Sequence, residues 1–252
     1  MPDSDKLSKL EVDHQPDNIR KRLQGRREYS YLGDIVLGAM DGCVTTFAVI
    51  AGAIGAGFSS GVAIVMGFAN LVADGFSMAV SNYHNTMSQR EMVEKARQRE
   101  LRHIETIPEG EREEIRQIFS SKGFQGDVLE HIVEVITSNR ELWVETMIKE
   151  ELGLQPDGPQ PFLAALATLG AFILIGSIPL MPFLITRINS AQTFMISILI
   201  TGVVFYIIGM VKGHVTQKSR IRSGIETLLT GGGAALLAYI VGEWLRETYG
   251  IL

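Results

Sequence analysis

Hydrophobic and polar positions divide the chain into long apolar runs and one long polar block. A helix needs about 20 mostly apolar residues to cross a bilayer. Runs of that kind cover residues 31–57, 61–84, 160–185, 191–211 and 224–246. The pattern therefore predicts five membrane-spanning helices, the third of them kinked near its end by Pro179 and Pro182.

The polar block between the second and third runs reads as helical. Its breaks are Pro108 with Gly110, the pair Lys122-Gly123, and Gly153. Between these breaks we expect helices over 85–107 (continuing the second membrane helix), 111–121, 126–138 and 140–152. The predicted fold class is all-α: a polytopic membrane protein of five transmembrane helices with an inserted cytoplasmic helical metal-binding domain. Its parts are residues 1–30 (tail), 31–84, 85–159 (the inserted domain) and 160–252.

Basic residues set the expected orientation, because cytoplasmic flanks of membrane helices are rich in Lys and Arg. The basic residues lie before the first run and between the fourth and fifth: Arg20, Lys21, Arg22, Arg26, Arg27, Lys212, Lys218, Arg220 and Arg222. Both segments face the cytosol if the N-terminus is cytoplasmic. The same topology places residues 85–159 in the cytosol.

The tail has no apolar core of a signal peptide. We expect residues 1–18 to be irregular and 19–31 to form a short basic interfacial helix. Net charge is −5, which gives no indication of nucleic-acid binding. Residues 89–151 hold 15 acids and 10 bases, so this block carries the whole net charge and predicts a cationic partner. The single cysteine, Cys43, is expected to be a packing residue.

Carboxylates inside the first two apolar runs are the strongest functional feature. Such groups are costly in a bilayer and are usually kept to pair, bind an ion or move a proton. Asp34 and Asp41 share a helix face two turns apart, while Asn70, Asp74 and Met78 share a face of the next helix. Asp41 lies about 10 Å inside Asp34, and Met78 about 8 Å inside Tyr83, at similar depth on antiparallel helices.

Carboxylate oxygen together with thioether sulfur favours a divalent transition metal. The alternative to a metal site is a structural role for both residues. Asp41 would then accept a hydrogen bond from a hydroxyl such as that of Thr45, and Met78 would pack in the core. The glycines of this hairpin predict close helix contacts, within the chain or between two copies. Gly231, Gly232 and Gly233 of the fifth run have the same implication.

Acidic pairs in the polar block suggest a second metal site. Glu100 with His103, and Glu111 with Glu114, are spaced i, i+3 on either side of the predicted turn at Pro108. A turn there can bring the pairs together. Glu-x-x-His occurs in di-iron carboxylate bundles, but those use two copies and this chain has one. The spacing i, i+4 would let Met147 and Glu151 close the site, and solvated surface carboxylates remain the alternative.

Several segments together resemble the vacuolar iron transporter family. They are DIVLGAMDG (34–42), ADGFSMAVSNY (73–83), ETIPEGEREEI (105–115) and LWVETMIKEELGL (142–154). The resemblance covers nearly the whole chain from about residue 28. It implies five membrane helices per subunit, a homodimer with the pathway at its interface, and proton-coupled export of Fe²⁺, or of Mn²⁺ in some members, from the cytosol.

The resemblance also implies roles for individual positions. Asp41 and Met78 match the membrane metal ligands, and the cytoplasmic ligands are matched by Glu100, Glu111, Glu114, Met147 and Glu151. Plant-like members have Glu where this chain has His103, which is still a metal ligand and alters the expected pH dependence. A helix-two carboxylate of those members aligns with Asn70, and Asp74 one turn away is its expected replacement.

The sequence thus predicts a non-enzymatic Fe²⁺/H⁺ antiporter without a permanent cofactor. Its expected partners are the lipid bilayer, protons, a second copy of the chain and the transported ion, Fe²⁺ or else Mn²⁺ or Zn²⁺. The expected location is the inner cell membrane, or a vacuolar-type membrane in a eukaryote. The alternatives are a Mn²⁺ exporter of the same mechanism, a membrane-anchored ferroxidase, and a metal sensor that would not need Asp41 and Asp74 in lipid.

Overall fold

The computed structural model describes residues 11–24, 29–185 and 189–250, and none of these residues forms a strand. Residues up to Ser30 and those from Tyr31 onward are two separate units. The first unit contains α2 (Pro16–Gln24) and a helical stretch at 11–13. The prediction of an irregular chain to residue 18 was therefore wrong for residues 11–13 and 16–18: the basic helix begins at Pro16, and proline is favoured in the first turn of a helix. The predicted end of this helix at residue 31 was also wrong, because α2 ends at Gln24 and residues 29–30 are not helical. Residues 1–10 and 25–28 lie outside the described residues.

Five helices of the second unit are long and apolar enough to cross a membrane, as predicted. They are α3 (Leu32–Gly55), α4 (Ser60–Thr106), the third span made of α8 (Pro161–Gly176), η2 (Ile178–Leu180) and α9 (Met181–Ile185), then α10 (Ser190–Val215) and α11 (Arg220–Tyr249).

The α-helix of the third span is interrupted where the prolines predicted a kink. Pro179 lies in the 3₁₀ turn η2, which interrupts the α-helix after Gly176. The Ser197 hydroxyl of α10 donates a hydrogen bond of 2.8 Å to the carbonyl oxygen of Pro179. A neighbouring helix thus satisfies a backbone group that the broken helix leaves free, as is required at membrane depth.

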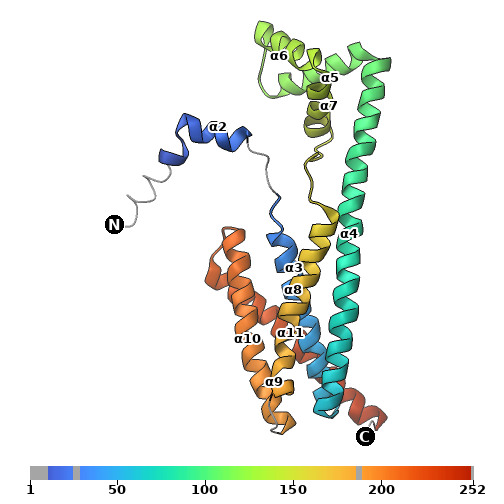
Figure 1. Cartoon of the computed structure of the whole chain (residues 1–252), viewed down its shortest axis with the longest axis vertical. Helices are drawn as coiled ribbons and strands as arrows, with labels where there is room; N and C mark the ends of the chain where they lie inside the picture. Colours follow the sequence, from blue (N-terminus) through green and yellow to red (C-terminus); the bar gives the residue numbers. More distant parts are fainter. Residues whose placement is uncertain (1–10, 25–28, 186–188, 251–252) are drawn as a thin grey trace. The chain divides into compact units, whose positions relative to one another are not determined.

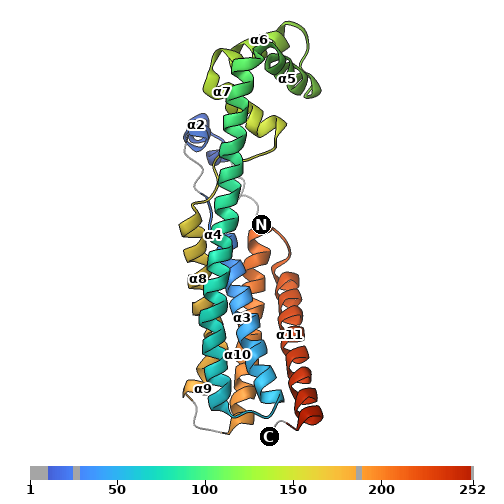
Figure 2. The same ribbon diagram turned by 90° about the vertical axis from the view of Figure 1, so that its right-hand side faces the viewer.

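Helix α3 lies at the centre of the bundle and packs against α4, α8, α10 and α11 (Figures 1 and 2). Its glycines make these contacts close. A Cβ added at Gly42 would lie 2.5 Å from the carbonyl oxygen of Phe172, and one at Gly55 would lie 2.3 Å from that of Tyr239. The close contacts predicted for the hairpin glycines therefore occur within one chain. On α11, an added Cβ at Gly232 or Gly233 would meet open space.

Helix α4 continues past the bundle to Thr106 and carries the inserted helices at its far end (Figure 1). These are α5 (Pro108–Ser121), α6 (Gly126–Ser138), α7 (Arg140–Thr146) and the π-helical turn η1 (Met147–Glu151). We call residues 85–159 the helical block. It has its own apolar core, which includes Ile115, Trp143 and Met147.

The last helix of the block differs from the prediction of one α-helix over 140–152. After Thr146 the chain widens into η1, in which the amide of Leu152 donates to the carbonyl of Met147 at 3.2 Å. Such single π-turns are rare and occur frequently at functional sites. Nothing in hydrophobic spacing alone predicts a turn of this kind.

The two ends of the bundle differ in the segments that they carry, and the orientation stays a prediction. The start of α4 meets the start of α10 at the end away from the helical block, where Ser60 Oγ donates to Ser190 Oγ at 2.8 Å. The turn between α10 and α11, with Lys212, Lys218 and Arg222, lies at the opposite end, on the same side as the block (Figure 1).

Candidate metal centre

The turn between α4 and α5 brings three potential ligands together. Glu100 and His103 lie near the end of α4, and Glu111 lies in the first turn of α5. The amide of Ile107 donates to the carbonyl of His103 at 2.7 Å, and Pro108 begins the next helix with a φ suited to it. One ligand atom from each of Glu100, His103 and Glu111 lies within 4.8 Å of the others. We call this group the α4–α5 cluster.

Its geometry is that of a buried carboxylate pair with an accessible imidazole. His103 Nδ1 lies 3.2 Å from Glu111 Oε1 and 4.0 Å from Glu100 Oε2. Arg99 Nε donates to Glu100 Oε1 at 2.9 Å. The side chains of Glu100 and Glu111 are 1% and 5% exposed, whereas His103 is 45% exposed. The imidazole is therefore the member of the cluster that solvent reaches.

One oxygen of the cluster has no partner. Glu111 Oε2 is buried and makes no hydrogen bond to any described residue. A buried acceptor left unsatisfied costs about 1–3 kcal/mol, and more when it is charged. A divalent cation held between the carboxylates would satisfy it.

Electrostatics at this position favour a cation. Burial raises the pKa of Glu111 to about 7, from an ordinary value of 4.5, and the negative charges of Glu114, Glu100 and Glu151 add to the rise while His103 opposes it. Burial also raises the pKa of Glu151, with Glu100 and Glu114 contributing. The negative charges of these carboxylates repel one another, and a bound metal ion would relieve that repulsion.

Three other residues predicted as ligands lie outside the close group. Glu114 and Glu151 are near enough to influence Glu111 electrostatically but are themselves exposed. Met147 is 0% exposed and packs in the core of the block, beside Ile115 and Trp143. The π-turn η1 runs from Met147 to Glu151 and packs against both α4 and α5.

A second polar group lies inside the membrane bundle. Asp41 on α3 and Asn70, Asp74 and Met78 on α4 are each half-buried, and Asp41 and Asp74 are close enough to interact electrostatically. Asn70 Nδ2 donates to Thr45 Oγ1 at 3.4 Å. The Thr45 hydroxyl itself donates to the backbone carbonyl of Asp41 at 2.9 Å rather than to its carboxylate. The carboxylate of Asp41 is thus not held by Thr45, the partner that the structural interpretation named.

Asp34 is held by a residue that sequence reasoning missed. Asn82 Nδ2 lies 2.8 Å from Asp34 Oδ1, 2.8 Å from Thr168 Oγ1 and 3.2 Å from the carbonyl oxygen of Ala164, so one amide group joins α3, α4 and α8. Asp34 Oδ2 is buried without a hydrogen-bond partner among the described residues.

Spacing along α4 could have identified Asn82. It follows Asn70, Asp74 and Met78 at intervals of four, so that all four residues occupy one slowly drifting helix face. We call them the α4 stripe. It leads from the middle of the bundle toward the end that carries the helical block.

Comparison with known proteins gives consistent matches over most of the chain. Residues 32–243 match the model of the VIT family. A protein of Toxoplasma gondii named "Vacuolar iron transporter" is 30% identical over 229 residues, which cover 87% of this chain and 76% of that protein. "Vacuolar iron transporter 1" of Arabidopsis thaliana is 29% identical over 215 residues (85% and 86%), and "Vacuolar iron transporter 2" of Oryza sativa subsp. japonica is 30% identical over 207 residues (82% and 84%).

Proposed function

Because this chain belongs to the VIT family, we propose that it exports Fe²⁺ from the cytosol in exchange for protons. Membership of the family together with five apolar helices makes it a multi-pass membrane protein of metal transport. The observation that carries the finer proposal is the half-buried group of Asp41, Asp74 and Met78 inside the bundle.

The helical block would collect the ion. The α4–α5 cluster offers two carboxylates and an imidazole, a donor set that suits first-row divalent metals. Its excess of acids raises the local concentration of cations near the protein. The block continues directly from α4, whose membrane portion carries the α4 stripe, so a single helix links the two sites.

Within the membrane, Asp41 and Met78 would bind the ion. Both are only half-buried in one chain, although a carboxylate at membrane depth is costly when it faces lipid. A second copy packed over α3 and α4 would cover the α4 stripe and bring two sets of ligands together. We therefore propose a homodimer with the pathway at its interface.

Protons would compete with the metal for the same carboxylates. Asp41 and Asp74 repel each other when both are ionised, and either a divalent cation or a proton relieves that repulsion. Protonation from the side away from the helical block would release the ion there. Asp34, held by Asn82 at the other end, would receive the ion from the cytosolic side.

Reconstitution into liposomes tests this function. Metal added outside should enter vesicles that contain a pH dye, and the interior should become more alkaline as protons leave. Asp41→Ala should abolish both signals, whereas Asp157→Ala, on an exposed carboxylate in the last residues of the block, should keep them. Unchanged flux in Asp41→Ala would contradict the proposal. Competition between Fe²⁺, Mn²⁺ and Zn²⁺ in the same vesicles gives the order of preference.

A further inference from the structure

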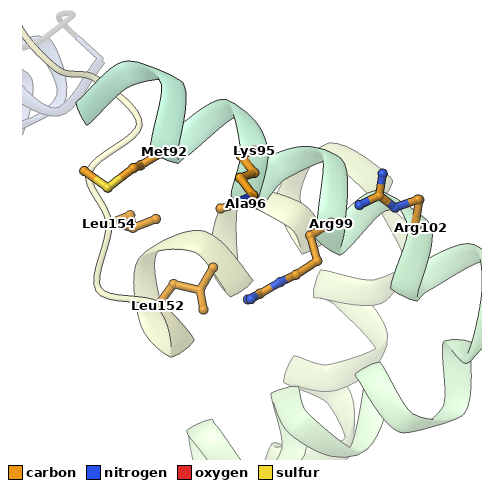
Figure 3. A pocket seen from close by; sticks show the side chains of 7 residues that line it. All are labelled: Met92, Lys95, Ala96, Arg99, Arg102, Leu152 and Leu154. Carbon is orange, nitrogen blue, oxygen red and sulfur yellow. The ribbon is translucent and has the colours of Figure 1, made fainter. Parts of the chain in front are cut away.

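A cavity of about 340 Å³ lies between α4 and the segment that follows η1. Three basic residues of α4, Lys95, Arg99 and Arg102, line it at spacings of four and three, so they share one helix face. Its apolar wall is formed by Met92, Leu152 and Leu154. Figure 3 shows Met92 and Leu154 near each other at one end and Arg102 at the other. We call this cavity the basic pocket.

Two of the three basic residues of this pocket differ from the other basic residues of the helical block. Seven of the ten Lys and Arg side chains of the block lie within 4.0 Å of a carboxylate: Arg97, Arg99, Arg112, Arg116, Lys122, Arg140 and Lys149. Arg90 donates to the carbonyl oxygen of Gly158. Among described residues, Lys95 and Arg102 have no carboxylate within that distance, and both line the basic pocket.

Basic side chains without a carboxylate partner are unexpected in a block that is rich in acids. Residues 89–151 contain 15 acids and 10 bases, so a basic side chain has many possible partners. Lys95, Arg99 and Arg102 instead lie within two turns of one another, where like charges repel. Arg99 uses its Nε for Glu100, which leaves its terminal nitrogens for another acceptor. An anion in the cavity would relieve the repulsion.

We propose that the basic pocket binds a small organic anion that carries phosphate or carboxylate groups. Guanidinium groups bind both kinds of oxyanion through paired hydrogen bonds. The volume is that of a site for a small molecule rather than for a lone inorganic ion. The wall of Met92, Leu152 and Leu154 would contact the carbon part of the ligand.

Position along α4 favours a soluble anion over a lipid headgroup. Met92 and Arg102 are eight and eighteen residues beyond His84, the predicted membrane end, or about 12 and 27 Å at a rise of roughly 1.5 Å per residue. The headgroup layer extends only about 5–8 Å beyond the hydrocarbon. The cationic end of the pocket therefore lies in the cytosolic solution if the topology is as predicted.

Calorimetric titration of the metal-stripped full-length protein tests the proposal. The protein is placed in nanodiscs of phosphatidylcholine and titrated with inorganic pyrophosphate, and separately with tricarballylate, at constant ionic strength. We expect saturable binding of one anion per chain. The double variant Lys95→Gln/Arg102→Gln should weaken it at least tenfold, since each charge-assisted hydrogen bond contributes more than the roughly 1.4 kcal/mol that a factor of ten represents.

The matched control is Arg90→Gln/Arg140→Gln, which removes the same charge from the block outside the pocket. Retained affinity in this control, with loss in the pocket variant, supports the proposal, and unchanged tryptophan fluorescence checks that both variants fold. Equal loss in the two variants, or no saturation with either anion, overturns it. Short-chain phosphatidic acid is titrated in the same way, and binding of this lipid without binding of either soluble anion overturns the assignment to a soluble ligand. None of these measurements uses metal, so the result is independent of the proposed transport.

Discussion

The membrane bundle and the helical block differ in how closely the backbones of their helices approach. In the bundle, α3 places Gly42 against the backbone of Phe172, and a Cβ there would lie only 2.5 Å from a carbonyl oxygen. In the block, large side chains such as Ile115 and Trp143 fill a closed core. The surrounding solvent explains the difference. Lipid is as apolar as the side chains, so the hydrophobic effect does not drive membrane helices together and they associate through close backbone approach. In water, the hydrophobic effect favours burial of large apolar side chains.

The candidate sites of the two regions also differ, in how deeply a single chain buries their carboxylates. Glu100 and Glu111 are almost fully buried within one chain, beside the core of the block. Asp41 and Asp74 are half-exposed on the bundle, where one chain leaves them partly open. Under the proposed function, the α4–α5 cluster would hold a cation within a single chain, whereas a second copy would complete the membrane group.

The largest effect should come from removing core volume in the block. Ile115→Ala deletes side-chain volume at a position that is 0% exposed, and such substitutions cost about 2–5 kcal/mol. In a Trp244→Phe background, fluorescence of Trp143 during urea unfolding reports the block alone. Loss of the bundle at the same urea concentration would show that the two regions unfold as one, contrary to this comparison.

In the bundle, the destabilising change should be the opposite one, the addition of side-chain volume. Gly42→Ala places a Cβ against backbone, which cannot move aside as a side-chain end could, and overpacking of this kind costs about 1–3 kcal/mol. Thermal unfolding in detergent should show a lower midpoint. Gly233→Ala, where the added Cβ meets open space, is the matched control: alanine favours the helix over glycine by about 1 kcal/mol, so the midpoint should stay the same or rise.

The pH dependence of the α4–α5 cluster tests whether its carboxylates are buried as deeply as the comparison with the membrane group requires. Glu111 titrates at about 7 in the folded block against 4.5 ordinarily, so the folded state binds more protons between these values. Stability of the metal-free block should therefore fall as pH rises from 4.5 to 7. Metal affinity should change in the opposite direction and weaken by roughly tenfold per pH unit below 7, because the proton must leave first.

Titration of Co²⁺ binding at several pH values measures this effect. Glu111→Gln should bind more weakly and lose the step near pH 7, and the stability of this variant should no longer fall as pH rises from 4.5 to 7. Glu109→Gln, on an exposed side chain of the same turn, should behave like the native protein. A step that persists in Glu111→Gln would assign the titration to another group.

The smallest effect is expected at Asn82. Asn82→Leu removes the donor to Asp34 while keeping the side-chain size, and a hydrogen bond to a charged group contributes about 1.5–3 kcal/mol, less where water can replace it. Transport in liposomes should need a severalfold higher metal concentration for half-saturation. Thr168→Val, which removes only the second acceptor of Asn82, should change it less. A loss equal to that of Asp41→Ala would instead give Asn82 a central role.

Much of the fold could be predicted because membrane helices are local. The five spans, the extension of α4 to Thr106 and the boundaries of α6 at Gly126 and Ser138 follow from apolar run length, helix formers and glycine breaks. The turn at Pro108 also predicted that Glu100 and Glu111 would approach each other. The π-turn η1 and the early start of α2 at Pro16 were missed, since hydrophobic periodicity does not distinguish such local variants.

By itself, the sequence determined where the chain crosses the membrane, which helices carry carboxylates, and that the acids concentrate in one block. Tertiary structure decided the remainder: that Gly42 meets α8 within the same chain, that Asn82 holds Asp34 and Thr168, and that Lys95 and Arg102 line a cavity with no carboxylate of the described residues within 4.0 Å. The physical reason is the distance along the chain over which each interaction acts. Helix formation and bilayer insertion depend on residues near one another in the chain, whereas the partner of a side chain depends on which distant helix packs against it.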